Sequence, residues 1–312
     1  MKIKFIVLSF FILLIFISFV KKQAVNITSK EQLGEVLFND KILSSDNSIS
    51  CSSCHKPEFA FADTVDFSRG VANKIAKRNT PTAMNMASRS LFFFDGRATT
   101  LEEQALGPIQ NPDEMNLPID TAIKRLKNSK YYTKAFMKLY NSLPNKENLC
   151  NAIASFENTL ETSESDYDAY VKGSKNNFTD AAMRGKDIFI GKGKCFDCHS
   201  GVDFTNDEFR NIGLYNNQNL NDKGRFEITK NEKDLGAFKV VGLRNVAITA
   251  PYMHNGMFKT LNEVVEYYNN PNKIIPNSIN KDTSVQSLRL TKQEENDLVA
   301  FLKTLTDKRF KK

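Results

Sequence analysis

The sequence predicts an all-α fold made of two related domains with long loops. The pattern Cys-x-x-Cys-His occurs twice, at residues 51–55 and 195–199, and a similar segment precedes each copy, GEVLF at 34–38 and GKDIF at 185–189. Helix capping signals, in which a Ser or Thr stands three residues before a Glu or Gln, begin at positions 29, 100, 260 and 291. No stretch of the sequence alternates apolar and polar residues as a half-buried strand does.

The repeat divides the chain into two domains, which we expect over residues 26–170 and 175–312. The polar segment KGSKNNFTD at 172–180 is the expected connection. In the second domain, the capping signal at Thr291 begins a helix with one apolar face, formed by Leu298, Phe301, Leu302 and Leu305.

The two pentapeptides contain four of the five cysteines and two of the three histidines of the chain. Two thiols at this spacing add to the vinyl groups of one haem, and the adjoining histidine ligates its iron. A redox Cys-x-x-Cys motif needs no following histidine, and a structural zinc site does not explain two such matched copies. The sequence therefore predicts two covalently bound haem c groups, held by Cys51, Cys54 and His55 in the first copy and by Cys195, Cys198 and His199 in the second.

The composition is that of a soluble globular protein, with 41% hydrophobic and 25% charged residues. The formal net charge of +7 is spread through Lys-rich segments and is not gathered into a basic arm, so nothing indicates a nucleic-acid partner. Cys150 is the one cysteine outside the pentapeptides, and its apolar helical neighbours predict a buried free thiol.

The N-terminus predicts export. A basic start, MKIK, is followed by uncharged apolar residues 5–20 and then by two lysines, the pattern of a signal peptide over residues 1–25. Because no small-x-small cleavage site is obvious, an uncleaved membrane anchor is the alternative. Either case places the remaining chain in the periplasm, which suits haem c.

Two further segments resemble one enzyme family. RNTPTAMNMASRSLFFFDGRATTLEEQALGPIQNPDEM (78–115) and LRNVAITAPYMHNGMFKTLNEVVEYYN (243–269), together with both haem motifs, are similar to the bacterial di-haem cytochrome c peroxidases and the related MauG enzymes. The resemblance implies two cytochrome c-like domains, with a peroxidatic haem above His55 and an electron-accepting haem above His199.

The resemblance also implies roles for other residues. Gln104 and Glu114 match polar residues on the distal side of the peroxidatic haem, and His254 matches a histidine near the haem edges. The positions that bind a calcium ion between the domains are Asn79, Thr249 and Pro251.

The chemistry of peroxide cleavage suits the two distal residues. A carboxylate such as Glu114 can take a proton from one peroxide oxygen and return it to the other, and Gln104 can donate a hydrogen bond. Without the resemblance, Glu114 reads as an exposed acid and Gln104 as an ordinary helix residue. Asp95 and Arg97 form either an ion pair serving this pocket or a structural pair.

Three departures from the family pattern matter. No histidine stands between His55 and His199, so we expect an open sixth position at the first haem. Phe94 replaces the usual tryptophan between the haems, which excludes a tryptophan radical relay at this position. Tyr268 stands where the family has the methionine ligand of the second haem, so we expect it to be the ligand. The alternatives are that Met257 is the ligand or that Tyr268 is an ordinary core tyrosine.

We therefore expect an exported peroxidase that reduces hydrogen peroxide with electrons from a small redox protein, a cytochrome c or a cupredoxin. A MauG-like oxidase acting on a protein or small molecule is the alternative. A di-haem electron carrier is disfavoured because a carrier needs both irons six-coordinate. The sequence leaves a homodimer open.

Overall fold

The computed structural model describes residues 26–174 and 176–311. The expected signal peptide or anchor, residues 1–25, lies outside the described residues. Within the described part of the chain, no helix is both long and apolar enough to cross a membrane.

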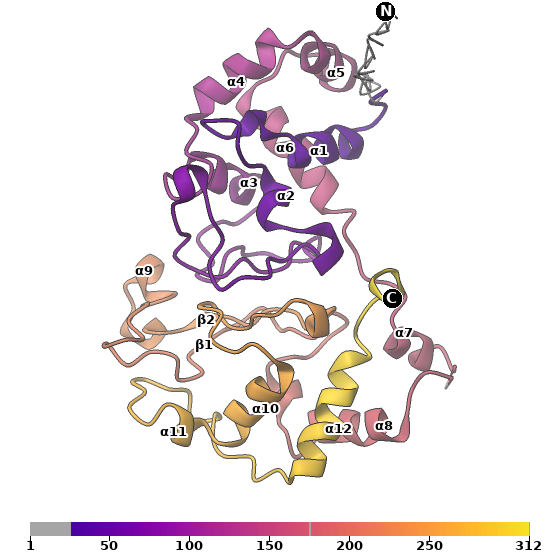
Figure 1. Ribbon diagram of the computed structural model, residues 1–312, viewed down its shortest axis with the longest axis vertical. Coiled ribbons are helices and arrows are strands. Elements are labelled where there is room, and N and C mark those ends of the chain that lie inside the picture. Colours follow the sequence, from indigo (N-terminus) through magenta and orange to yellow (C-terminus); the bar gives the residue numbers. More distant parts are fainter. Residues whose placement is uncertain (1–25, 175, 312) are drawn as a thin grey trace, which may run out of the picture.

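The protein is mostly helical and forms two lobes stacked along its long axis (Figure 1), which confirms the predicted fold class. The helices before the lobe junction are α1 (Lys30–Asn39), α2 (Cys51–Cys54), α3 (Leu101–Gln110), α4 (Ile119–Asn128), α5 (Lys130–Tyr140) and α6 (Lys146–Glu157). Those after it are α7 (Asp166–Val171), α8 (Asp180–Ile190), α9 (Phe226–Thr229), α10 (Leu261–Asn269), α11 (Pro271–Ile274) and α12 (Lys292–Lys303).

One small sheet was not predicted. Strand β1 (Phe209–Arg210) pairs antiparallel with β2 (Phe238–Lys239), so that Phe209 lies opposite Lys239. Strands of two residues are too short to show an alternating pattern, so they could not be predicted from the sequence. The pair lies in the second lobe on the side that faces the first (Figure 1).

The predicted helix starts are confirmed. Thr260 and Thr291 form complete capping boxes with Glu263 and Glu294. The hydroxyls of Ser29 and Thr100 also accept from the backbone three residues later. At these two helices, however, the returning side chain bonds the residue before the cap, Thr28 or Thr99.

Each lobe contains the same close helix crossing. A Cβ atom built on Gly34 of α1 would lie 1.9 Å from the carbonyl oxygen of Ala152 in α6. A Cβ atom built on Gly185 of α8 would lie 1.9 Å from the carbonyl oxygen of Asp297 in α12. The two glycines begin the repeated segments GEVLF and GKDIF, so the sequence repeat marks one helix crossing used twice.

Each lobe also has its own hydrophobic core. The first extends from Ile27 to Leu160 and the second from Phe178 to Leu305. The apolar face expected on α12 is buried in the second core, and the free thiol of Cys150 is buried as expected. The division of the chain after residue 170 stays a prediction, and helix α7 contacts the second core through Tyr167 and Tyr170.

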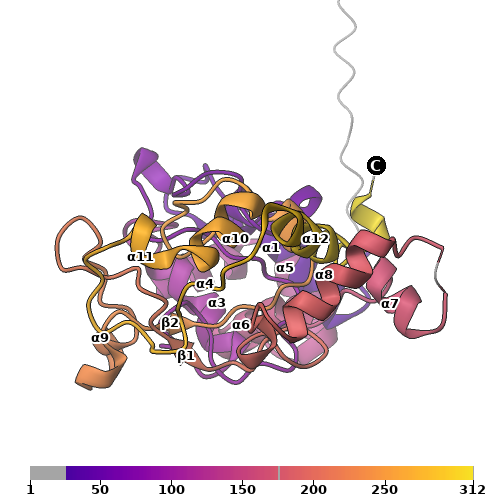
Figure 2. The same cartoon turned by 90° about the horizontal axis from the view of Figure 1, so that it is seen from below.

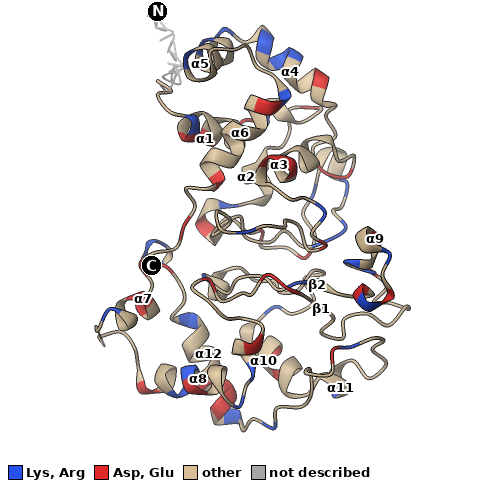
Figure 3. Ribbon diagram, turned by 180° about the vertical axis from the view of Figure 1, so that it is seen from behind, with Lys and Arg blue, Asp and Glu red and all other residues tan. Residues whose placement is uncertain are grey.

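The chain end returns to the junction of the lobes. The backbones of Ser165 and Asp307 form an antiparallel β-bridge, and the backbone nitrogen of Tyr167 donates to the carbonyl oxygen of Thr304. Seen from below, α7 and α8 lie on the opposite side of the molecule from α9 and α11 (Figure 2). Positively and negatively charged residues alternate along the ribbon of both lobes, with no segment of a single sign standing out (Figure 3).

Candidate functional site

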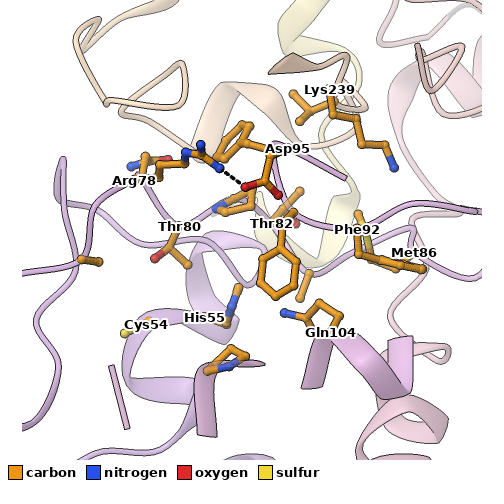
Figure 4. A pocket seen from close by; sticks show the side chains of 18 of the residues that line it. Cys54, His55, Arg78, Thr80, Thr82, Met86, Phe92, Asp95, Gln104 and Lys239 are labelled. Carbon is orange, nitrogen blue, oxygen red and sulfur yellow. Dashed lines mark hydrogen bonds and ion pairs between the residues drawn. The ribbon is translucent and has the colours of Figure 1, made fainter. Parts of the chain in front are cut away.

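A cavity of about 930 Å³ lies in the first lobe and reaches the second. It is lined by Cys51, Cys54 and His55 of the first pentapeptide, by Gln104 and Glu114, and by Lys239 of β2. Figure 4 shows Gln104 extending from α3 into the space that His55 also faces. The structure thus brings together residues that are far apart in the sequence.

In both pentapeptides, a hydrogen bond to a backbone carbonyl group orients the histidine ring. Nδ1 of His55 lies 2.9 Å from the carbonyl oxygen of Phe61, and Nδ1 of His199 lies 3.0 Å from that of Phe204. Phe61 and Phe204 both have a φ of 56°, which turns their carbonyl groups toward the rings. A carbonyl oxygen accepts a hydrogen bond from Nδ1–H, so the proton stays on Nδ1 and Nε2 remains free to bind a metal.

The surroundings fit a covalent haem at each pentapeptide. Burial lowers the pKa of His55 and of His199, which keeps each imidazole neutral and able to ligate iron. The four cysteines of the two motifs form no disulfide bonds, so each thiol is available for attachment to haem. Before attachment, burial raises the pKa of Cys54 to about 11 and its thiol is protonated near neutral pH.

Glu114 is a partly buried acid at this cavity, which argues against a fully exposed surface acid. Its Oε1 accepts a hydrogen bond of 2.7 Å from Asn111 Nδ2. Burial raises the pKa of Glu114 above that of a free carboxyl group, while the hydrogen bond from Asn111 and the charge of Arg97 oppose this rise. The carboxyl group is therefore set up to exchange a proton closer to neutral pH than a surface acid.

The Asp95–Arg97 pair exists, and it belongs to a larger network that joins the lobes. Asp95 is buried and lies 2.9 Å from Arg97 and 2.6 Å from Arg78. Arg78 also donates two hydrogen bonds to Asp222 of the second lobe, at 2.7 and 2.8 Å. The bridging of Asp95 and Asp222 by Arg78 was not predicted from the sequence.

Phe94 and His254 lie where the lobes meet. The carbonyl oxygen of Phe94 accepts a 2.8 Å bond from the backbone nitrogen of Lys239, and Phe94 lines the cavity. His254 stacks on Phe238 with ring centroids 3.7 Å apart, and burial lowers its pKa to about 4. His254 is therefore neutral at physiological pH.

Tyr268 lies beside the second pentapeptide. Burial raises its pKa, and the charges of Tyr267, Cys195 and Cys198 contribute in the same direction. Met257, the alternative ligand, and Tyr268 both pack against a small apolar cluster formed by Leu214, Phe258, Tyr267 and Ile275. Tyr267, next to Tyr268 in α10, is fully buried, and its hydroxyl donates to the carbonyl oxygen of Ile212 at 2.5 Å.

The residues expected to bind calcium lie at the same junction. The backbone nitrogen of Asn79 donates to His254 at 2.7 Å, and its Nδ2 donates to Val65 at 3.0 Å. The hydroxyl of Thr249 donates to Val246, and Pro251 follows a cis peptide bond. Within residues 26–174 and 176–311, no three acidic, His or Cys side chains cluster as a metal site.

One buried acid was missed. Glu157, the last residue of α6, lines the cavity, and its neighbours in SFENTL carry no motif that would single it out. Met84 and Met86 line the same cavity.

Two helical lobes, each with a haem-attachment motif and an oriented histidine, define a di-haem protein of the cytochrome c type. Residues 28–176 match the family model described as di-haem cytochrome c peroxidase, and residues 182–306 match the model described as cytochrome c.

Relatives agree with this class. The chain is 34% identical to the methylamine utilization protein MauG of Methylorubrum extorquens over 88% of this chain and 78% of that protein. It is 35% identical to the cytochrome c551 peroxidase of Nitrosomonas europaea over 88% and 79%. The solved structure of a MauG-like protein associated with microbial copper homeostasis superposes with a TM-score of 0.83 and 31% identity, covering 90% of this chain and 91% of that one. The chain belongs to the di-haem cytochrome c peroxidase and MauG family, a family of oxidoreductases.

Proposed function

We propose that the protein is an exported di-haem peroxidase that reduces hydrogen peroxide to water with electrons from a small redox protein, a cytochrome c or a cupredoxin. The observation that carries this proposal is one cavity lined by His55, whose Nε2 is left free by the bond at Nδ1, by Gln104 and by the partly buried acid Glu114. Peroxidase relatives at about the same identity as MauG support it.

The chain supplies binding and proton transfer at this cavity. The bound haem supplies the redox chemistry. Glu114 accepts the proton of one peroxide oxygen and returns it to the other, and Asn111 holds its carboxyl group in place. Gln104 donates a hydrogen bond that orients the peroxide. In the net reaction, one peroxide, two electrons and two protons give two water molecules.

Electrons reach the cavity from the second lobe. We propose that they enter at the haem held by Cys195 and Cys198 and cross at the contact between Phe94 and Lys239. Because phenylalanine is hard to oxidise, transfer across this contact is direct. Export follows from the signal pattern of residues 1–25.

A calcium ion is proposed at the junction of the lobes. Asn79, Thr249 and Pro251 offer amide, hydroxyl and carbonyl oxygens, which are the hard ligands that calcium prefers. With few carboxylates in reach, its affinity should be modest.

MauG-like oxidation of a protein or small molecule is the second candidate. The observation that favours it is Tyr268 beside Cys195 and Cys198, because a phenolate ligand at the second haem stabilises oxidised iron.

Stopped-flow mixing of the holoprotein with peroxide and a reduced cytochrome c tests the proposed function. The proposal predicts oxidation of two cytochrome molecules per peroxide. Peroxide reactivity without cytochrome oxidation would favour the MauG-like candidate, and reduction by cytochrome without any peroxide reactivity would indicate an electron carrier.

A further inference from the structure

Glu157 is a buried acid for which the proposed mechanism has no use. Its side chain lines the first cavity, its exposed fraction is 6%, and Oε2 has no hydrogen-bond partner among the described residues. A buried polar atom without a partner destabilises the folded protein, and folded proteins retain few such atoms. A carboxyl group kept at this cost beside a cofactor cavity indicates a function there.

Three features of its surroundings favour the protonated form. Burial raises the pKa of Glu157 to about 8, and the negative charge of Glu102 contributes to the rise. Asn151 of α6 holds Glu102 near this helix through a 3.2 Å hydrogen bond. Glu157 also ends α6, where the helix dipole disfavours a negative charge.

Among the described residues, no cation lowers the pKa of Glu157. Helices α1, α3 and α4 contact α6, and their other ionisable side chains do not shift the pKa of Glu157. These are Lys30, Glu31, Glu35, Glu103, Asp120, Lys124, Arg125 and Lys127, of which all except the half-buried Arg125 are exposed. The guanidinium of Arg125 donates to backbone carbonyl groups of residues 42–45. The thiol groups nearest the cavity, Cys51 and Cys54, carry the haem.

We propose that Glu157, at a pH where it is ionised beside the oxidised haem, takes up one proton when the haem of the first cavity is reduced, and so offsets the charge of the incoming electron. The electron comes from the reduced donor protein and the proton from solvent. The carboxylate becomes a carboxylic acid, and no other bond changes. This inference rests on the first haem of the proposed function and does not depend on peroxide turnover.

The proton and the electron are thermodynamically linked. An electron on the haem strengthens proton binding by Glu157, so the reduction potential of the first haem falls as pH rises across the titration of this group. One proton per electron corresponds to a fall of up to about 59 mV per pH unit. Glu114 has a partner in Asn111 and a nearby cation, so its contribution lies at lower pH.

Spectroelectrochemical titration of the holoprotein from mildly acidic to alkaline pH, without peroxide, tests the inference. We expect a falling potential of the first haem around and above neutral pH in the wild type, and a nearly flat one in Glu157→Gln. The control Glu147→Gln removes an exposed carboxyl group of the same helix and should behave as the wild type. A flat wild-type profile, or a slope retained in Glu157→Gln, would overturn the inference.

A second variant decides the matter if Glu157→Gln fails to mature. Glu102→Gln removes the charge that raises the pKa of Glu157, so the sloping region should move to lower pH with its steepness unchanged. If the sloping region of the potential stays at the same pH in Glu102→Gln, the inference is likewise overturned. Because no peroxide is present, either result is separate from a failure of the peroxidase function.

Discussion

Two of the acids that line the first cavity, Glu114 and Glu157, have different surroundings. Glu114 has a hydrogen-bond donor in Asn111 and the charge of Arg97 in its vicinity, whereas Glu157 has an unpartnered oxygen and a negative neighbour in Glu102. Such differences push two pKa values apart and assign different proton-transfer roles to chemically identical groups.

Replacing Glu114 by glutamine should leave both haems attached and lower peroxide turnover by about 100-fold or more, the usual contribution of a positioned acid–base group. Burial raises the pKa of Glu114, so wild-type turnover should fall as pH drops through a value above that of a free carboxyl group. This acidic limb should be absent from the variant. Steady-state rates across pH measure both effects, and near-normal turnover would remove Glu114 from its role.

Replacing Tyr268 by phenylalanine should change the visible spectrum and the potential of the second haem if the phenol is its ligand. The first haem should be unaffected, which serves as the internal control. An unchanged second haem would assign the position to Met257 or leave Tyr268 as a core tyrosine.

The haem motifs could be predicted because the identity and spacing of their residues carry the chemistry, whereas Gln104 and Glu114 were indicated only by the resemblance to the family. The burial of Tyr267 could not be predicted, because the apolar positions of α10 suggest one buried face, whereas a second cluster around Leu214 and Ile275 buries another. Glu157 could not be predicted, because its significance lies in the absence of a partner in three dimensions.

At the level of elements, the lobes repeat one helix crossing, α1 on α6 and α8 on α12. The helix starts could be predicted because capping is local to four residues. The pairing of β1 with β2 and the ion pairs of Arg78 could not, because they join segments distant in sequence.

The close crossings predict that Gly34→Ala and Gly185→Ala each destabilise the protein. Alanine normally favours a helix, but here its methyl group would overlap a backbone carbonyl oxygen of the partner helix. We expect a loss of about 1–3 kcal/mol in the free energy of unfolding. Chemical denaturation of the holoprotein measures it.

Gly107→Ala in α3 is the matched control. A Cβ atom at this position would meet only the end of the Phe93 ring, at 3.0 Å, and the ring can move. Equal stability of all three variants and the wild type would show that the crossings tolerate a side chain.

For the whole molecule, the junction between the lobes connects electron entry with the peroxide cavity. The bonds of Arg78 to Asp222 and of Phe94 to Lys239 hold this junction. The proposed calcium ion lies at the same place.

Removal of calcium should therefore loosen the junction, lowering both the melting temperature and the rate of electron transfer between the haems. Thermal denaturation and single-turnover kinetics after exhaustive chelation, with and without added calcium, measure these effects. If chelation changes neither, the calcium assignment is wrong.

We expect an open iron position above His55, because no histidine stands between His55 and His199. The proposed reduction of peroxide depends on this open position. Met84 and Met86 line the cavity, but a thioether binds ferric iron weakly compared with imidazole. An electron paramagnetic resonance spectrum of the fully oxidised protein tests this feature directly. We predict one high-spin and one low-spin haem, with cyanide converting the high-spin signal without prior reduction. Two low-spin haems, with peroxide reactivity appearing only after one-electron reduction, would contradict it.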